Sequence, residues 1–466
     1  MPGKAWQPLV AVLVALGIPA AAAAKWRHLV TQHPVAALAL AAGWVVLCGA
    51  VVLARQALSG PARRRLEQAG NAADRAAGWW LSGYGRRYRQ WVLDSRRYVD
   101  VKDLATGGDH TPELDDVYVD VALVRRAPHQ VSGNPLGSVA EDATGRHSVS
   151  EFLDRRERVV LAVSGPPGSG KSTLLAHAAR RSARAGRRNR RRVPVLLALR
   201  EHAGTIAASP GTPLPDVLRA AVSGMPGSEP DGWWERQLRR GRCMILLDGL
   251  DEVARQEDRG AVATWVERQI SSYPGNHFVI TSRPHGFPGP VIAHADVLAV
   301  RPFTAEQVQL FLNRWYLAAE RHATGAVSKA QMRAVRIRAG ESAVGLLKLL
   351  RDNPALYDLT VNPLLLTMIA TVHRYRGALP GSRADLYGEI CQVMLSRRIQ
   401  AKNLPELLPW PAKQKLLAAL AYQMMLNRAS ELPASQVLGI LDPLLSRLPQ
   451  SVAGPAFLDD VSATGC

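Results

Sequence analysis

The chain has 466 residues, which is enough for two or three domains, and 47% of them are hydrophobic, so there is ample material for a core. Its formal net charge of +19 favours anionic partners, although a coding bias toward arginine and alanine would produce the same excess. The four cysteines contain no CxxC pair, which excludes a disulfide framework and a cysteine-ligated zinc site and fits a reducing cytosol.

Two uncharged runs occur near the N-terminus, at 5–24 and 34–54. A helix of the second run would reach about 30 Å, one hydrocarbon thickness, so we predict a transmembrane helix there. Pro8, Gly17 and Pro19 weaken the first run, which is either a second transmembrane helix or a cleaved signal peptide. We therefore assign residues 1–58 to two transmembrane segments.

Arginines follow the second run and predict the orientation of the chain. Arg55 and the run Arg63–Arg65 should stay on the cytoplasmic side. We expect the chain in the inner (plasma) membrane, with everything after Arg55 in the cytoplasm.

Residues 59–150 form a basic juxtamembrane linker and a loop-rich lead-in. Alternating arginines and aromatic residues predict a helix lying against lipid headgroups, an interpretation that we favour over nucleic-acid binding. These residues include Trp79, Trp80, Tyr84, Arg86, Arg87, Tyr88, Arg89 and Trp91. One short strand is expected near 117–124.

Residues 151–303 alternate between short apolar runs and helical stretches. This pattern predicts an α/β domain with a parallel sheet and helices on both faces. The expected strands are Val159–Val163, Val193–Leu199, Met244–Leu247, Phe278–Thr281 and Val297–Val300.

The first expected strand runs into GPPGSGKS, which matches the phosphate-binding loop G-x-x-x-x-G-K-[ST] between a strand and a helix. Its glycines let backbone N–H groups point at phosphate oxygens, and the helix N-terminus adds partial positive charge. Lys171 would reach the β- and γ-phosphates, and the Ser172 hydroxyl would bind Mg²⁺. The predicted nucleotide-binding residues here are Gly165, Pro166, Pro167, Gly168, Ser169, Gly170, Lys171, Ser172 and Thr173.

Acidic residues follow the apolar run MILL. Asp248 ends that strand, where a carboxylate faces the phosphate loop across a parallel sheet and would hold Mg²⁺ directly or through water. Asp251 and Glu252 follow, and one of them would orient or deprotonate the attacking water. The alternative is that these acidic residues only cap the next helix.

The third candidate position is Arg283, after the strand that ends in Thr281 and Ser282. An arginine there can contact the γ-phosphate and report its presence. The alternative is a strand-end arginine bound to a carboxylate. The eight arginines between Arg180 and Arg192 predict an exposed helix end and loop near an anionic surface.

Taken together, these blocks resemble the NACHT group of STAND-class NTPases. The run Asp248–Glu252 (DGLDE), with its second acidic pair, and Ser282–Pro284 resemble the acidic and sensor blocks of that group. Arg301–Tyr316 resembles the start of its helical subdomain, where Thr304 and Gln307 also form a capping-box pattern.

Two later blocks extend the resemblance. Val361–Ile369 resembles the block whose proline, here Pro363, packs near the nucleotide base, and Leu379–Arg398 resembles the entry to a winged-helix subdomain. The resemblance implies a helical subdomain at 304–375 and a winged-helix-like subdomain at 376–466, truncated at its end.

The resemblance also implies a function. Such proteins are switches that bind ADP when closed and ATP with Mg²⁺ when active, hydrolyse ATP slowly, and form homo-oligomers in the ATP state. In bacteria they are associated with defence. The membrane helices would be either an effector or an anchor. The C-terminal sensor region of the group has no counterpart in this sequence, so the sequence is either that of a truncated gene product or that of a protein that relies on a separate sensor protein. Nucleic acid is not an expected partner.

Two other functions stay open. A membrane-tethered AAA+-like remodeller would need an arginine finger placed in trans and a second sensor arginine in the helical lid, for which Arg314 and Arg351 are candidates. A non-hydrolysing scaffold would use nucleotide as a structural ligand. ATP is preferred to GTP by resemblance, since no Asn-Lys-x-Asp motif occurs.

Overall fold

The computed structural model describes residues 82–98, 112–125, 145–155, 157–185, 192–253, 256–284, 295–325, 328–392, 407–427, 429, 432–448 and 452–463. Every helix and strand described lies in the compact unit Tyr84–Cys466. The transmembrane segments predicted at 1–58 lie outside the described residues. Within the described ranges, no helix is long and apolar enough to cross a membrane.

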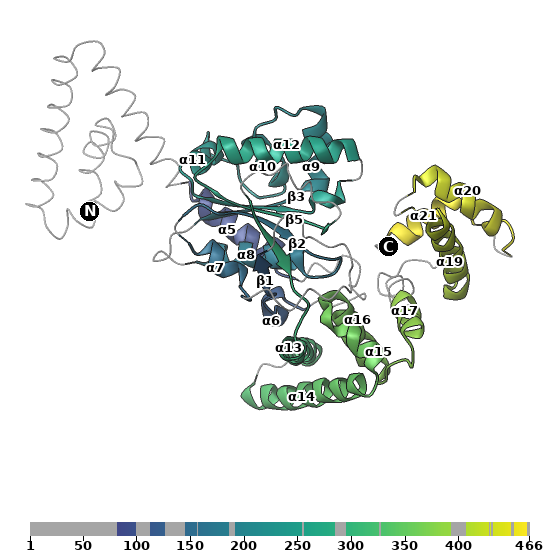
Figure 1. The fold of residues 1–466 in the computed structure, drawn as a ribbon. Coiled ribbons are helices and arrows are strands. Elements are labelled where there is room, and N and C mark those ends of the chain that lie inside the picture. The colour runs from purple at the N-terminus through teal and green to yellow at the C-terminus, as the bar shows by residue number, and fades with distance from the viewer. Residues whose placement is uncertain are drawn as a thin grey trace, which may run out of the picture. The chain divides into compact units, whose positions relative to one another are not determined.

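A six-stranded sheet forms the centre of the described N-terminal half, in the order β1-β6-β2-β5-β4-β3 (Figure 1). All neighbours are parallel except β1 and β6. The parallel sheet expected from the apolar runs is confirmed, because runs such as Leu161–Val163 are fully buried. The strands are β1 (Leu123–Arg125), β2 (Val160–Ser164), β3 (Val193–Ala198), β4 (Cys243–Asp248), β5 (His277–Ser282) and β6 (Asp296–Val300).

Helices cover both faces of this sheet, as the alternating pattern predicts (Figure 1). On one side lie α5 (Tyr84–Ser95), α7 (Val149–Leu153) and α8 (Lys171–Arg184). On the other lie α9 (Leu199–Ala208), α10 (Leu214–Ala221), α11 (Trp233–Arg239) and α12 (Gln256–Ser272). Leu174 and Leu175 of α8 and Val262 and Val266 of α12 are completely buried, so each layer adds to the core.

The strand expected at 117–124 is wrong over most of its length. Residues Leu114–Val117 form a short helix, α6, and the strand begins only at Leu123. Asp115 and Asp116 lie in the first turn of α6, where carboxylates favour a helix N-terminus.

Helix α5 packs against strand β3 and helix α11. Tyr84, Tyr88 and Val92 recur every four residues and form one buried face. The Tyr88 hydroxyl donates to the Pro194 carbonyl at 2.7 Å, and its ring packs edge-on against Trp234. The headgroup interpretation is therefore wrong for Tyr84 and Tyr88, whose rings belong to the core.

Arg180 is also placed differently from the sequence expectation of an exposed helix end. The residue is 2% exposed, and its guanidinium forms an ion pair with Asp115, 65 residues away in the sequence. Arg184 binds the same carboxylate, and Arg180 also donates to the Leu93 carbonyl. These contacts join α8 to α5 and α6. The remaining arginines at 186–191 lie outside the described residues.

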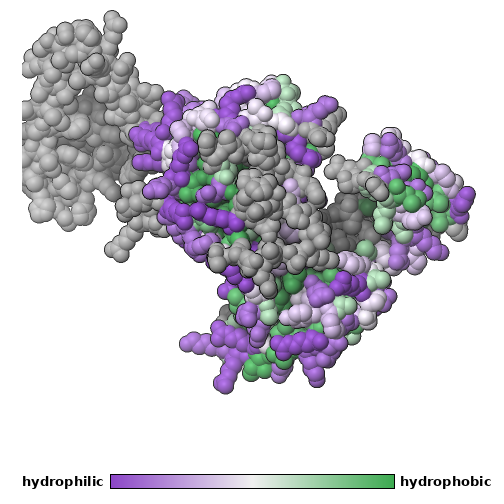
Figure 2. All heavy atoms as spheres, in the orientation of Figure 1, coloured by the Kyte–Doolittle hydropathy of each residue, from purple (hydrophilic) through white to green (hydrophobic). Residues whose placement is uncertain are grey.

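Long helices follow the sheet. They are α13 (Ala305–Thr324), α14 (Lys329–Arg351), α15 (Pro354–Tyr357), the 3₁₀ turn η4 (Asp358–Val361) and α16 (Pro363–Arg376). The capping box predicted at Thr304 and Gln307 is present at the start of α13. Helix α14 exposes Ile337 and Val344, and Figure 2 shows that hydrophobic residues on this surface are interspersed with hydrophilic ones.

The remaining described elements are α17 (Arg383–Gln392), α19 (Trp410–Leu426), α20 (Ala434–Leu445) and α21 (Gly454–Ala463). Leu416 of α19, Leu441 and Leu445 of α20 and Phe457 of α21 share one small buried cluster. The described part of 376–466 is helical and shows no strand, so the winged-helix assignment stays a prediction.

The buried ion pair of Arg180 predicts a stability effect. Asp115→Asn should lower the free energy of unfolding by about 3 kcal/mol, because it leaves a buried guanidinium without its carboxylate. Asp116→Asn on the same helix is the control, since its partner Arg321 is half exposed and such pairs contribute about 0–1 kcal/mol. Urea unfolding of both variants checks this, and equal losses would contradict the assigned role of Asp115.

Candidate functional site

The loop between β2 and α8 is shaped by its glycines. Gly168 and Gly170 have φ angles of 73° and 86°, which strain any residue with a Cβ. A Cβ at Gly168 would lie 2.7 Å from Asn362 Oδ1, so the loop is also in close contact with the residue before α16. The backbone curl that the motif predicts is thus present.

Lys171 lies folded back on this loop. Its Nζ donates to the Gly165 carbonyl at 2.8 Å and to the Pro166 carbonyl at 3.1 Å. Burial lowers the pKa of its ammonium group, and the carboxylates of Asp251, Asp248 and Glu252 oppose that shift. A phosphate would supply a full negative charge to an ammonium whose hydrogen bonds, among the described residues, go to these two carbonyls.

The residues of the loop fit a nucleotide phosphate. The Ser169 hydroxyl is buried and has no hydrogen-bond partner within the described part of the chain, so it suits a phosphate oxygen as its acceptor. The Ser172 hydroxyl and the Asp248 carboxylate line the same cavity, and such oxygens are what Mg²⁺ takes from a protein when phosphates complete its coordination.

Asp248 is held in place at the end of β4. Its Oδ1 accepts a hydrogen bond from Thr281 Oγ1 at 2.6 Å, and that hydroxyl accepts from the Gly249 N–H at 2.9 Å. Thr281 is the penultimate residue of the neighbouring strand β5 and is fully buried. The sequence placed Thr281 beside Arg283 but did not reveal that it orients the predicted magnesium ligand.

Asp251 binds Arg283. Its carboxylate accepts the backbone N–H of Arg283 at 2.9 Å and the guanidinium Nε at 3.0 Å. Of the two interpretations of Arg283, the structure thus shows an arginine bound to a carboxylate. The same arginine lines the nucleotide cavity. This geometry favours Asp251 as the residue that positions Arg283 and leaves Glu252 as the candidate for activating water.

Glu252 has a partner that the sequence reading missed. Arg200, just after β3, donates to Glu252 Oε2 at 2.8 Å. Since β3 and β4 are parallel neighbours, residues that follow them must meet at one edge of the sheet. Arg200 could have been found from that rule, had the strand order been known.

A cavity of about 450 Å³ contains most of the predicted residues, a size within the range of small-molecule sites. Pro363 lies there because Asn362 Nδ2 donates to the Pro167 carbonyl at 2.9 Å and the Leu364 N–H donates to the Gly168 carbonyl at 3.2 Å. The predicted residues that line it are Pro167, Gly168, Ser169, Gly170, Lys171, Ser172, Thr173, Asp248, Asp251, Glu252, Arg283 and Pro363.

Gly165 and Pro166 do not line this cavity. Their backbone carbonyls accept the hydrogen bonds that hold Lys171. An apolar wall that the motifs do not reveal includes Val119, Phe303 and Phe311. It suits the face of an aromatic base.

The loop, the strand-end carboxylate and the mostly parallel sheet define a P-loop nucleoside triphosphatase. Residues 159–319 match the family model of the NACHT domain. The chain therefore carries a NACHT domain, as its sequence blocks suggest.

Solved structures show only distant likeness. The Orc1 protein of Aeropyrum pernix in complex with DNA is 17% identical, with 67% of this chain and 79% of that chain covered and a TM-score of 0.29. A Walker-type ATPase of Pyrococcus abyssi is 12% identical, with 68% and 87% covered and a TM-score of 0.30. A RuvB variant of Thermotoga maritima is 12% identical, with 67% and 83% covered and a TM-score of 0.27. No curated protein sequence matches the chain.

Because a Cβ at Gly168 would lie too close to Asn362, we predict that a side chain at this position impairs nucleotide binding. Gly168→Ala should weaken nucleotide binding about tenfold or more, because its Cβ would strain the loop and displace Asn362. Gly211→Ala is the control, since a Cβ there meets nothing within 4 Å. Titration with a fluorescent ADP analogue measures both, and unchanged affinity in Gly168→Ala would show that the loop tolerates a side chain.

Proposed function

We propose that this protein is a nucleotide-operated switch that binds ADP and ATP with Mg²⁺ and hydrolyses ATP slowly. The observation that carries the proposal is the pair of hydrogen bonds from the start of α16 to the phosphate loop, at Pro167 and Gly168. A nucleotide in this loop touches both the sheet domain and the helical region. Ligands shift such two-part arrangements when they contact them differently.

Three ion-pair and hydrogen-bond contacts support slow turnover. Lys171 is bound to loop carbonyls, Arg283 to Asp251, and Glu252 to Arg200. Each group that would act on the γ-phosphate or on water therefore has a protein partner that it must exchange or share. A group that must first leave a partner adds to the barrier of the reaction.

The proposed chemistry is attack of water on the γ-phosphate. Mg²⁺ would neutralise charge on the phosphate oxygens, held by Ser172 and Asp248. Lys171 binds the phosphates, Arg283 contacts the transferred group, and Glu252 accepts the proton of the attacking water. Asp251 holds Arg283 at the cavity throughout.

The membrane-related parts of the proposal rest on the sequence. The uncharged runs at 5–24 and 34–54 would anchor the chain in the bacterial inner membrane, with the NTPase domain in the cytoplasm. By resemblance, ATP-bound chains would associate, a separate protein would sense the stimulus, and the output would serve defence.

The AAA+-like alternative gains nothing from the candidate arginines. Arg314 donates to the Tyr118 carbonyl, and neither Arg314 nor Arg351, at the end of α14, lines the nucleotide cavity, so neither is placed as a sensor arginine on the site of its own chain.

Nucleotide content tests the switch directly. The full chain, purified in detergent and denatured, should release stoichiometric ADP, identified by chromatography, because a closed switch retains its product. Lys171→Ala should release none and should bind added ADP about 100-fold more weakly, as two lost charge-assisted hydrogen bonds would give. Wild-type affinity in Lys171→Ala would refute nucleotide binding at this loop.

Hydrolysis tests the role of Glu252. Glu252→Gln should retain ATP affinity within about threefold but lose about 10²–10⁴-fold in turnover, since a general base is removed while the phosphate contacts stay. Glu257→Gln, an exposed glutamate on α12, is the matched control and should turn over normally. Phosphate release under single-turnover conditions measures both variants, and undiminished release from Glu252→Gln would exclude it as the base.

A further inference from the structure

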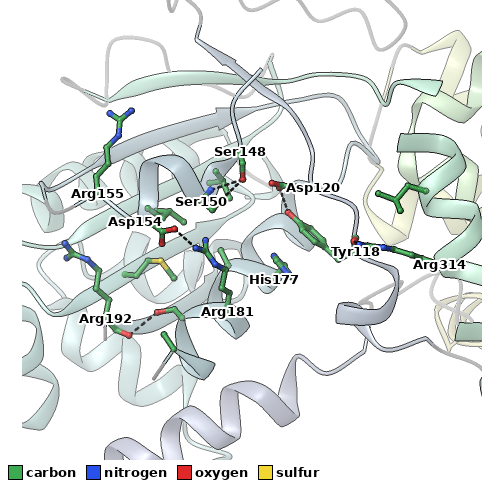
Figure 3. A pocket seen from close by; sticks show the side chains of 17 residues that line it. Tyr118, Asp120, Ser148, Ser150, Asp154, Arg155, His177, Arg181, Arg192 and Arg314 are labelled. Atoms are coloured by element: carbon green, nitrogen blue, oxygen red, sulfur yellow. Dashed lines mark hydrogen bonds and ion pairs between the residues drawn. The ribbon is translucent and has the colours of Figure 1, made fainter. Parts of the chain in front are cut away.

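A second cavity, of about 680 Å³, lies against the phosphate-loop helix α8. It is bounded by α7, by α8, by the segment 118–120 and by α13. Figure 3 shows its polar side chains, which come from these separate elements. Its charged residues are Arg155, Arg181, Arg192, Arg314, Asp120 and Asp154.

The charge of this lining is positive. Four arginines face two aspartates, and one aspartate, Asp154, is paired with Arg181. Arg155 stacks at 4.9 Å over the Phe152 ring, and Arg314 donates to the Tyr118 carbonyl. Neither of these two guanidinium groups has a carboxylate partner within the described ranges. Arginines left with neutral partners bind phosphate and carboxylate groups well.

Part of the cavity lining is less polar than its arginines. The rings of Tyr118 and His177 stack at 3.7 Å, and Leu153, Met244 and Leu310 also line it. Burial lowers the pKa of His177, so this ring is neutral near pH 7 and adds no charge. A lining that combines arginines with aromatic and aliphatic side chains suits an anion with an organic body.

We propose that this cavity is a second anion site, for a ligand that carries phosphate groups, and that its occupancy changes the affinity of the nucleotide cavity. The phosphate could belong to a soluble metabolite or to a lipid headgroup.

The segment 118–121 provides the coupling. Tyr118 lines both cavities, and Val119 and Val121 line the nucleotide cavity. Helix α13 holds this segment through Arg314, at the Tyr118 carbonyl, and through Gln307, whose Nε2 donates to the Asp120 carbonyl at 2.7 Å. A phosphate that draws Arg314 away frees the Tyr118 carbonyl and shifts the shared wall.

The binding test uses the full chain in neutral detergent with the loop saturated by ADP and Mg²⁺, titrated calorimetrically with inorganic tripolyphosphate. Arg155→Gln should weaken this binding about tenfold, the scale of one charge-assisted hydrogen bond. Asp154→Asn should tighten it, because Arg181 is then released to the ligand. Arg336→Gln, an exposed arginine on α14, is the control and should leave it unchanged.

Opposite shifts in Arg155→Gln and Asp154→Asn, the two residues that follow α7, establish the site. Absence of binding, equal affinity in Arg155→Gln and the wild type, or an equal loss in Arg336→Gln would overturn it. Adding phosphatidylglycerol to the detergent then separates the sources: displacement of tripolyphosphate identifies a lipid headgroup, and undisturbed binding identifies a soluble phosphate. This arm does not depend on hydrolysis or switching.

Coupling between the two cavities is measured as the change in ADP affinity when saturating tripolyphosphate is added. Competition at the phosphate loop would affect the wild type and Arg155→Gln equally, so only the difference between them reports the second cavity. A several-fold larger change in the wild type is expected. Identical changes would leave an anion site without coupling and overturn that half of the proposal.

Discussion

The site depends on one constraint of the fold, the parallel order of β2, β5, β4 and β3. Parallel neighbours end at the same edge of a sheet, so residues that follow different strands must meet there. Lys171 follows β2, Arg283 follows β5, Asp248 ends β4 and Arg200 follows β3. No local sequence feature brings these residues together, and a single change of strand order would scatter them.

Electrostatics at that edge follow from the same arrangement. Burial penalises the charge of Lys171, while three carboxylates nearby offset the penalty. Arg283 and Arg200 in turn bind two of those carboxylates, on Asp251 and Glu252. The cluster therefore sets the cations Lys171, Arg283 and Arg200 against the carboxylates of Asp248, Asp251 and Glu252.

Much of the fold could be predicted because its signals are local. The apolar runs became buried strands, the glycine pattern became the loop, and Thr304 with Gln307 became a capping box. The predictions that failed concern residues whose partners lie far away in the sequence. The pattern of Tyr84 and Tyr88 suits a headgroup surface as well as a protein face, and only the position of Trp233 and Trp234 selects the protein.

The same reasoning explains Arg180 and Arg200. An arginine-rich stretch has the composition of an exposed surface, and nothing near Arg180 in the sequence indicates a carboxylate on α6. The motif positions of the site were accessible because their spacing is set by chemistry, whereas Arg200 and Thr281 act through neighbours in the sheet. Their roles depend on strand order, which apolar patterning does not encode.

The contacts of Arg180 and Arg184 have a consequence for how stability is distributed along α8. The C-terminal half of this helix is tied to Asp115 and Leu93, while its first residue follows a loop whose glycines have positive φ angles. Local opening occurs where few buried contacts oppose it. Because Leu174 and Leu175 are completely buried, fluctuations of α8 should be confined to its first turn at Lys171, so that the loop before it can rearrange while the rest of the helix keeps its place in the core.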